Sequence, residues 1–123
     1  MKKVAAMLAL LLLLALLGCA GSPASAIGGF FSAAGHGEID DAMGYLSARL
    51  LQMGNDKLRA ALVKFAQDSA AKGGLKSVAV EQLQVNGQIA NAVAVLTYGN
   101  GTVSHENVTL IQEDHRWKLD FKK

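Results

Sequence analysis

Cysteine and proline are scarce in this sequence, and each occurs once, as Cys19 and Pro23. A chain with a single cysteine cannot form an internal disulfide, so a disulfide-stapled small fold is excluded. The three histidines have no metal-ligand spacing to one another or to the cysteine, which argues against a zinc site. Gly99-Asn100-Gly101 joins two strand-like runs and opens no helix, so it is not a phosphate-binding loop. From these absences we expect neither a metal nor a cofactor.

The single cysteine directly follows an apolar run near the amino terminus. A start with two lysines precedes the apolar residues 4–17, and small residues follow from Gly18 onward. A membrane-spanning helix needs about 20 apolar residues, so this run is too short to cross a bilayer. Its length and its small-residue boundary are typical of a signal peptide, which we predict over residues 1–18.

The sequence Leu16-Leu17-Gly18-Cys19 resembles the lipobox of bacterial lipoproteins. The resemblance implies that cleavage occurs between Gly18 and Cys19, that the Cys19 thiol carries a diacylglycerol, and that the new amino terminus is open to a further acyl chain such as palmitate. Several acyl chains anchor a protein stably, whereas one chain is marginal. In Gram-negative lipoproteins an Asp after the cysteine favours the inner membrane, so Ala20 implies the outer membrane, facing the periplasm. A free or buried thiol is the alternative.

Removal of residues 1–18 changes the bulk properties of the chain. The 105 residues that remain are enough for one domain with a modest core. Basic residues fall from 12 to 10, equal to the 10 acidic residues, so no electrostatic footprint for nucleic acid remains. We expect residues 19–26 to be the lipidated cysteine and a flexible linker, and residues 27–123 to be the domain. Alternatively, Ser22 caps a first helix that Pro23 opens.

Apolar residues recur at helical spacing through the first half of the domain. A first helix is marked by Ile27, Phe30, Phe31 and Ala34 and ends at Gly35 and Gly37. Apolar residues at steps of three and four predict a second helix over 39–53, which Gly54 stops. Asn55 is the expected cap of a third helix that runs to Gly73-Gly74. The predicted buried line of this third helix is Leu58, Leu62, Phe65 and Ser69.

After Gly74 the apolar residues alternate, which predicts strands over about 75–85, 88–98, 102–112 and 117–121. Asn86-Gly87 joins the first two strands as a tight turn, because both turn positions need a positive φ. Helices followed by an antiparallel meander indicate the α+β class. The strand over 88–98 is apolar on both faces, so either a second copy of the chain covers its outer face or the sheet curls around a core.

Several short motifs occur in a familiar order over residues 27–121. They are Phe30-Phe31, Gly37-Glu38-Ile39-Asp40-Asp41-Ala42, Asn86-Gly87 with Ala90 and Val93, and Trp117-Lys118-Leu119. In this order they resemble the nuclear-transport-factor-2-like superfamily, and more narrowly small bacterial lipoproteins that carry a domain of unknown function with this fold. The resemblance implies three N-terminal helices packed on a curved four-stranded antiparallel meander sheet, the cone-shaped, cystatin-like α+β fold.

Two sets of residues are candidates for a site. Large side chains that could line a ligand pocket, or be ordinary core, are Phe30, Phe31, Leu46, Tyr98 and Trp117. Enzymes of the superfamily place acid–base residues inside the cone, and the residues that could point inward are Glu81, Asn91 and Glu106. Asp120 alternates with apolar neighbours and is expected to face solvent.

These observations predict a non-catalytic, membrane-anchored envelope lipoprotein that binds a partner protein or a small apolar ligand, with a homodimer as one form of partnership. The alternative is a small hydrolase or isomerase of the same fold that uses a cone-lining carboxylate. A closed polar cavity that holds two of the three acid–base candidates would favour the enzyme. An apolar cavity, or none, would favour binding.

Overall fold

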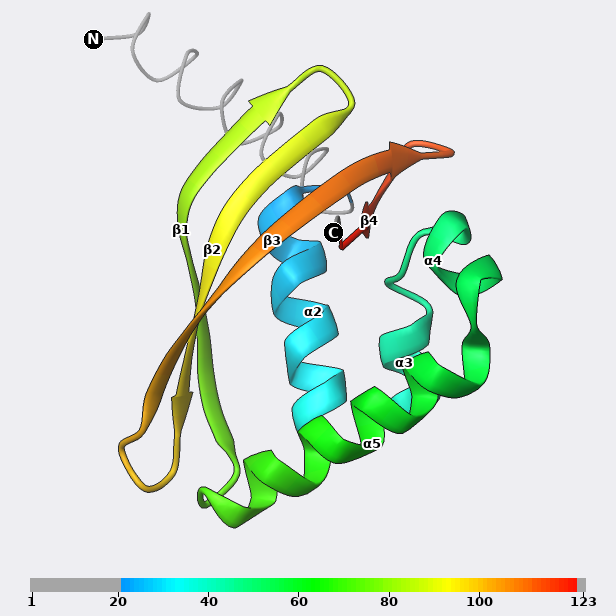
Figure 1. Ribbon diagram of the computed structural model, residues 1–123. Coiled ribbons are helices and arrows are strands. Elements are labelled where there is room, and N and C mark those ends of the chain that lie inside the picture. Colours follow the sequence, from blue (N-terminus) through cyan, green and yellow to red (C-terminus); the bar gives the residue numbers. More distant parts are fainter. Residues whose placement is uncertain (1–20, 122–123) are drawn as a thin grey trace, which may run out of the picture.

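The computed structural model describes residues 21–121, so Gly18 and Cys19, on which the cleavage and lipidation predictions rest, lie outside the described residues. Within this part of the chain the helices precede the strands (Figure 1). The helices are α2 (Pro23–Gly35), α3 (Ile39–Met43), α4 (Ala48–Met53) and α5 (Asn55–Ala71). The strands are β1 (Leu75–Asn86), β2 (Ile89–Tyr98), β3 (Val103–Glu113) and β4 (Arg116–Leu119).

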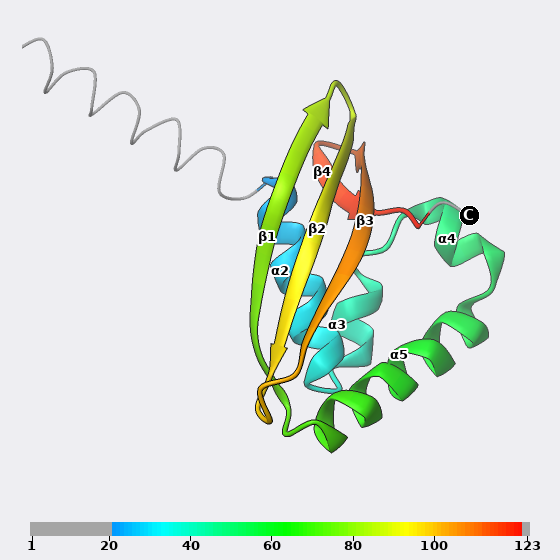
Figure 2. The ribbon, with the colours of Figure 1, turned by 60° about the vertical axis from the view of Figure 1, so that its left-hand side comes forward.

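The four strands form one antiparallel sheet in the order β1-β2-β3-β4, which confirms the predicted meander and the α+β class. Gly87 has a φ of +64° in the predicted turn between β1 and β2, as that turn requires. The sheet curves around α2, and the helices lie on its concave side (Figures 1 and 2). The turn between β2 and β3 rests on the end of α5, where the Asn100 amide donates to the Lys72 carbonyl at 2.9 Å.

The concave face of the sheet is set by every second residue of β2. Ala90, Ala92, Ala94, Leu96 and Tyr98 are buried there, which decides the orientation of a strand that is apolar on both sides. Successive residues of a strand point to opposite faces, so the intervening residues lie on the convex face. The three alanines leave space for the side chains that fill the cone, among them the rings of Phe30 and Phe31 of α2.

The convex face of the sheet is not covered by any helix of the described residues (Figure 2). Val93, Val95 and Thr97 of β2 lie on it and are partly buried by their neighbours in the sheet, and Ile89 is exposed at one end. Of the two expected explanations, the second is found in part: the sheet curls around a core, but this core lies on the concave side and leaves the apolar residues of the convex face uncovered. The first, a second copy on the convex face, stays a prediction.

The first helix begins earlier than the expected linker allows. Pro23 occupies the first helical position, and the Ser22 hydroxyl accepts a hydrogen bond from the Ser25 amide at 3.1 Å. Proline is favourable there because it has no amide hydrogen to leave unsatisfied, and serine caps the first turn. The alternative interpretation is thus confirmed, and a flexible linker through residue 26 is wrong for residues 23–26.

The predicted helix over 39–53 is wrong as one element, since residues 44–47 separate α3 from α4. The Ser47 amide donates to the Leu119 carbonyl at 2.9 Å, and the Leu119 amide donates to the Tyr45 carbonyl at 2.8 Å. These backbone bonds to β4 replace the bonds that would continue the helix. Apolar spacing alone could not reveal this competition, because the partner strand lies more than 70 residues away in sequence.

The third predicted helix is present as α5, but its start differs in detail. Gly54, with a φ of +153°, holds the N-cap position, whereas Asn55 is already helical and makes no capping bond. The expected buried line is confirmed in its centre and end, since Leu62 and Ser69 are buried. Leu58 and Phe65 are only partly buried, because α5 packs along the rim of the cone rather than inside it (Figure 1).

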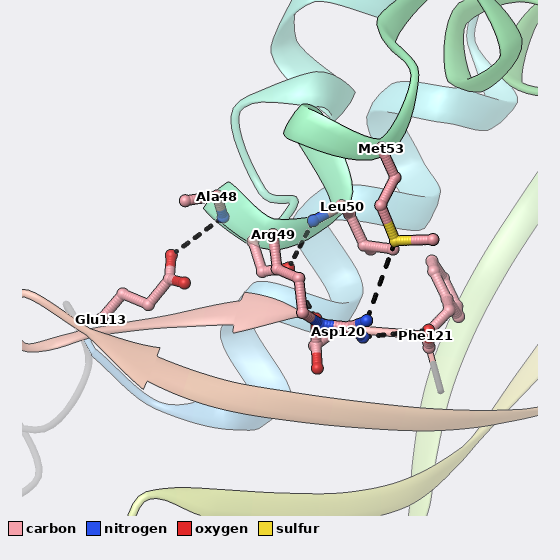
Figure 3. A network of polar contacts seen from close by, with 8 residues as sticks. Ala48, Arg49, Leu50, Met53, Glu113, Asp120 and Phe121 are labelled. Atoms are coloured by element: carbon pink, nitrogen blue, oxygen red, sulfur yellow. Dashed lines mark hydrogen bonds and ion pairs between the residues drawn. The ribbon is translucent and has the colours of Figure 1, made fainter. Parts of the chain in front are cut away.

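Asp120 is buried, with 4% of its surface exposed, so the prediction that it faces solvent is wrong. β4 ends at Leu119, and strand alternation therefore no longer governs the next residue. The Asp120 carboxylate accepts from the Ser47 hydroxyl at 2.7 Å and from Arg49 Nε at 3.1 Å (Figure 3). Ser47 in turn accepts from the Leu50 amide at 3.3 Å, which caps α4.

We name the contact of Ser47, Arg49 and Asp120 the C-terminal latch. Glu113 of β3 supports it, because its carboxylate accepts from the Ala48 amide at 3.2 Å in the first turn of α4 (Figure 3). The latch ties α4 to the last residues of the chain. Its carboxylate and its hydroxyl are buried, whereas Arg49 is half exposed.

Removal of the latch carboxylate should destabilise the fold strongly. Asp120→Ala leaves the buried Ser47 hydroxyl without this acceptor, and we expect a loss of roughly 2–4 kcal/mol in the free energy of unfolding, measured by urea titration. Asp40→Ala is the matched control, because Asp40 is exposed in its ion pair with Arg59. That control should change the free energy by less than about 0.5 kcal/mol. Equal losses in the two variants would contradict a stabilising role for the latch.

Candidate functional site

The five large side chains predicted to line a pocket are mostly core. Phe30, Phe31, Leu46 and Tyr98 are buried among one another and their neighbours, and the rings of Phe30 and Phe31 meet edge to face with centroids 5.0 Å apart. Aromatic rings in this arrangement pack a core efficiently. Trp117 is also buried, but it borders an open groove beside the cone. Only this one of the five predicted residues therefore reaches the candidate site.

The three acid–base candidates do not meet. Glu81 and Asn91 lie on the convex face, opposite Val93 and Thr109 respectively, and both are exposed. Glu106 pairs with the buried Ala94, yet its side chain is exposed, because β4 does not extend beside this part of β3. Asn91 accepts a hydrogen bond from the Thr109 hydroxyl at 3.0 Å. The structure thus places no two of these candidates in a common cavity.

An open groove of about 1000 Å³ lies between α2, the α3 region and the β3–β4 hairpin. We name it the α2–β4 groove. Trp117 and Lys118 of β4 line it, and so do Tyr45, in the neighbouring segment after α3, and Glu38 and Asp41 near the start of α3. Lys118 closes one side, where its ammonium group donates to the Gly44 carbonyl at 2.5 Å.

The floor of the α2–β4 groove consists of small side chains. They occupy one line of α2 at helical spacing: Ser22, Ser25, Ala26, Gly29, Ser32 and Ala33. From the N-cap Ser22 to Ala33 the helix rises by eleven steps of about 1.5 Å, which gives the floor a length of about 16 Å. Serine hydroxyls along it can donate and accept hydrogen bonds. This repeat of small residues was visible in the sequence, but sequence analysis that searched for large and charged side chains missed it.

Tyr45 lies directly against Gly29. A Cβ atom placed on Gly29 would collide with the Tyr45 ring and hydroxyl, whereas one placed on the preceding Gly28 would meet no atom within 4 Å. Gly29 therefore allows a close approach between α2 and the segment that follows α3. The absence of a side chain at Gly29 sets the position of the Tyr45 wall.

Both ends of the α2–β4 groove carry charged side chains. At the amino end of α2, Gly21 lies beside the His115 carbonyl, and Arg116 lines the groove there. At the carboxyl end, the Glu38 amide donates to the Ala33 carbonyl at 2.9 Å, and Glu38 and Asp41 bring negative charge. Asp114 stands beside Arg116 at the amino end, and Lys118 lines the groove near Gly44, so the groove presents charges of both signs along its length, with hydroxyls between them.

The turn between β3 and β4 has an unusual backbone. Asp114 and His115 have φ values of +49° and +64°, the left-handed region that both central positions of such a hairpin turn require. A non-glycine residue there costs roughly 1–2 kcal/mol. The predicted strands over 102–112 and 117–121 imply a turn over 113–116, which the structure confirms, and both Asp114 and His115 line the groove.

Two further kinds of site are not found in this part of the chain. Across residues 21–121, His, Asp and Glu side chains form no group of three that could hold a metal ion. No helix in the same range is long and apolar enough to span a membrane.

Three comparisons with known proteins place this geometry in context. The model of a family described as a domain of unknown function (DUF4878) matches residues 17–120. None of the curated proteins matches the sequence significantly. A crystal structure from Campylobacter jejuni, provisionally described as an NTF2-like transpeptidase, is similar with a TM-score of 0.67 and 21% identity, over 76% of this chain and 92% of that one. This likeness confirms the nuclear-transport-factor-2-like fold.

Neighbouring glycines of α2 should respond oppositely to the same substitution. Gly28→Ala should raise the free energy of unfolding by about 0.5–1 kcal/mol, because alanine favours a helix and the new methyl group meets open space. Gly29→Ala gains the same propensity but displaces Tyr45, so it should be less stable than Gly28→Ala by about 1–3 kcal/mol. Urea titration of both variants measures the difference. Equal stabilisation would show that Tyr45 is not held against Gly29.

Proposed function

The chain belongs to the family described as a domain of unknown function (DUF4878), and from the geometry of its groove we propose that it is a lipid-anchored envelope protein that binds an extended segment of a partner protein. The observation that carries this proposal is the open α2–β4 groove with its floor of small residues. Its length of about 16 Å would take about five residues of extended chain at 3.3 Å each.

The lining of the groove favours a peptide over a small apolar ligand. Pockets for apolar ligands are mostly enclosed and lined by apolar side chains. This groove is open and presents the hydroxyls of Ser25 and Ser32 together with charges of both signs. An extended peptide carries backbone donors and acceptors along its whole length, and these suit such a lining. Ser25 and Ser32 are exposed, and their short side chains let a peptide backbone come close to α2.

The anchor in this proposal is the lipid on Cys19. Support comes from the sequence, since the lipobox-like residues follow a basic start and a short apolar core. Cys19 lies only two positions before Gly21, so the domain would sit directly on the membrane surface. With Ala20 after the cysteine, the resemblance favours the outer membrane, facing the periplasm.

A hydrolase or isomerase is the second candidate, and less supports it. The carboxylates that were expected inside the cone, Glu81 and Glu106, are exposed, and a general base works best in a pocket that tunes its pKa. The similar protein from Campylobacter jejuni is described as a transpeptidase, which would need an activated nucleophile. Within residues 21–121, no hydrogen bond links the hydroxyl of a groove serine to a histidine or carboxylate side chain, and the His36 imidazole bonds to the backbone carbonyl of Ser32.

Cys19→Ala should abolish both acylation and processing. The precursor should keep residues 1–18 and take up no labelled palmitate, because the modified thiol is the substrate for both steps in the lipoprotein pathway that the lipobox resembles. Ala20→Asp is the control: it should keep the label and, in a Gram-negative host, move the protein toward the inner membrane. Unchanged mass and membrane fractionation of Cys19→Ala would remove the lipoprotein proposal.

A photoreactive residue in the groove should capture the partner. In the full chain, p-benzoylphenylalanine replaces Ser25 in the groove, Gln67 on exposed α5 as the control, or Val93 on the convex face. We expect an adduct from position 25 that is absent from position 67 and that Ser32→Trp abolishes by filling the groove. A product of twice the chain mass from position 93 would support the homodimer. Equal adducts from positions 25 and 67 would contradict the groove.

A further inference from the structure

The tip of the β1–β2 hairpin combines exposed apolar side chains with a lack of charge. Leu83, Val85 and Ile89 are 40%, 53% and 42% exposed, respectively. The residues between and beside them are glutamine, asparagine and glycine, and the sequence holds no charged residue from Gln82 to Ser104. Val85 pairs with Ala90 of the concave side and Ile89 lies on the convex side, so both faces of this end of the hairpin carry exposed apolar side chains. Exposed apolar side chains gathered at one end of a small domain mark a contact surface. We name residues 83–89 the hairpin tip.

The hairpin tip lies at the end of the molecule where the described chain begins. Gly21 lies beside the His115 carbonyl in the β3–β4 turn. One strand further on, the Gln112 amide donates to the carbonyl of Gln88, in the β1–β2 turn, at 2.8 Å. Figures 1 and 2 show the same arrangement: the hairpin projects past the first turn of α2. The β2–β3 turn and the end of α5 lie at the opposite end.

We propose that the hairpin tip docks on the lipid surface to which the chain is anchored, an inference that rests on the proposed acylation of Cys19. Two residues of chain span at most about 7 Å, so an acylated Cys19 brings the membrane to this end of the domain. The tip then places Leu83, Val85 and Ile89 at the interface. No charged side chain of the tip has to lose its hydration there, and the side-chain amides of Gln84, Asn86 and Gln88 suit the headgroup layer.

This docking would give the α2–β4 groove a fixed orientation. Arg116, Asp114 and His115 at its amino end lie at the membrane-facing end, and Glu38 and Asp41 lie farther from the surface. A partner segment in the groove would then run away from the membrane rather than along it. A domain held by the lipid alone would tumble on its tether and have no such preference.

Two valines with almost equal exposure allow a matched test. Val85 lies at the hairpin tip, and Val103, which is 50% exposed, lies at the opposite end of the sheet. The full chain is produced with Val85→Cys or Val103→Cys, labelled with an environment-sensitive nitrobenzoxadiazole dye, and reconstituted into vesicles of phosphatidylethanolamine and phosphatidylglycerol. Nitroxide-labelled lipids in the vesicles should quench the dye at position 85 at least about twofold more than the dye at position 103.

Three other outcomes are possible, and each would contradict one specific claim. Equal quenching at positions 85 and 103, with the protein in the vesicles, removes the docking proposal and leaves the anchor intact. A dye at position 85 that is shielded from iodide in water but not quenched by nitroxide lipids points to a protein contact, which also removes docking. The unsubstituted chain should take no dye; if it does, Cys19 is free, and the anchor falls together with the docking. Circular dichroism confirms that both variants are folded.

Discussion

The backbone pairing between Leu119 and the segment after α3 is the constraint on which the rest of the structure depends. Two short hydrogen bonds, from Ser47 to Leu119 and from Leu119 to Tyr45, place β4 between β3 and the helices. The C-terminal latch continues this pairing with a buried carboxylate that accepts from Ser47 and Arg49. Because a buried carboxylate without partners is costly, the latch specifies one position for α4 relative to the end of the chain.

Because core side chains fill the cone, the candidate site lies outside the cone rather than within it. The concave face of the sheet is filled by side chains of α2 and of the sheet itself, and within the described residues the open space lies beside this core, where α2, the α3 region and the β3–β4 hairpin meet. There the small residues of α2, the Tyr45 wall and the strained β3–β4 turn form the α2–β4 groove. The latch and the groove share a cause, since both depend on how residues 44–47 leave the helical path.

The amino end of the groove and the hairpin tip lie at the same end of the domain. Gly21, the β3–β4 turn and the β1–β2 turn follow one another there. A lipid anchor just before Gly21 would bring all three to the membrane surface. Under this proposal, the domain would act as an oriented platform, in which the fold supplies a rigid groove and the anchor supplies its position and direction.

By itself, the sequence determined the α+β class, the order of the elements and most turns. These features follow from local signals: apolar spacing near three and a half residues, alternation, and an Asn-Gly turn that needs positive φ. It also gave the lipobox-like motif, which no described residue tests. Tertiary structure alone decided the break at residues 44–47, the burial of Asp120, and which face of β2 points inward. Each of these depends on a partner distant in sequence, as Leu119 is from Tyr45. Recognition of the groove requires both the sequence and the tertiary structure. Its small residues are a local sequence pattern, whereas its walls come from three separate parts of the chain.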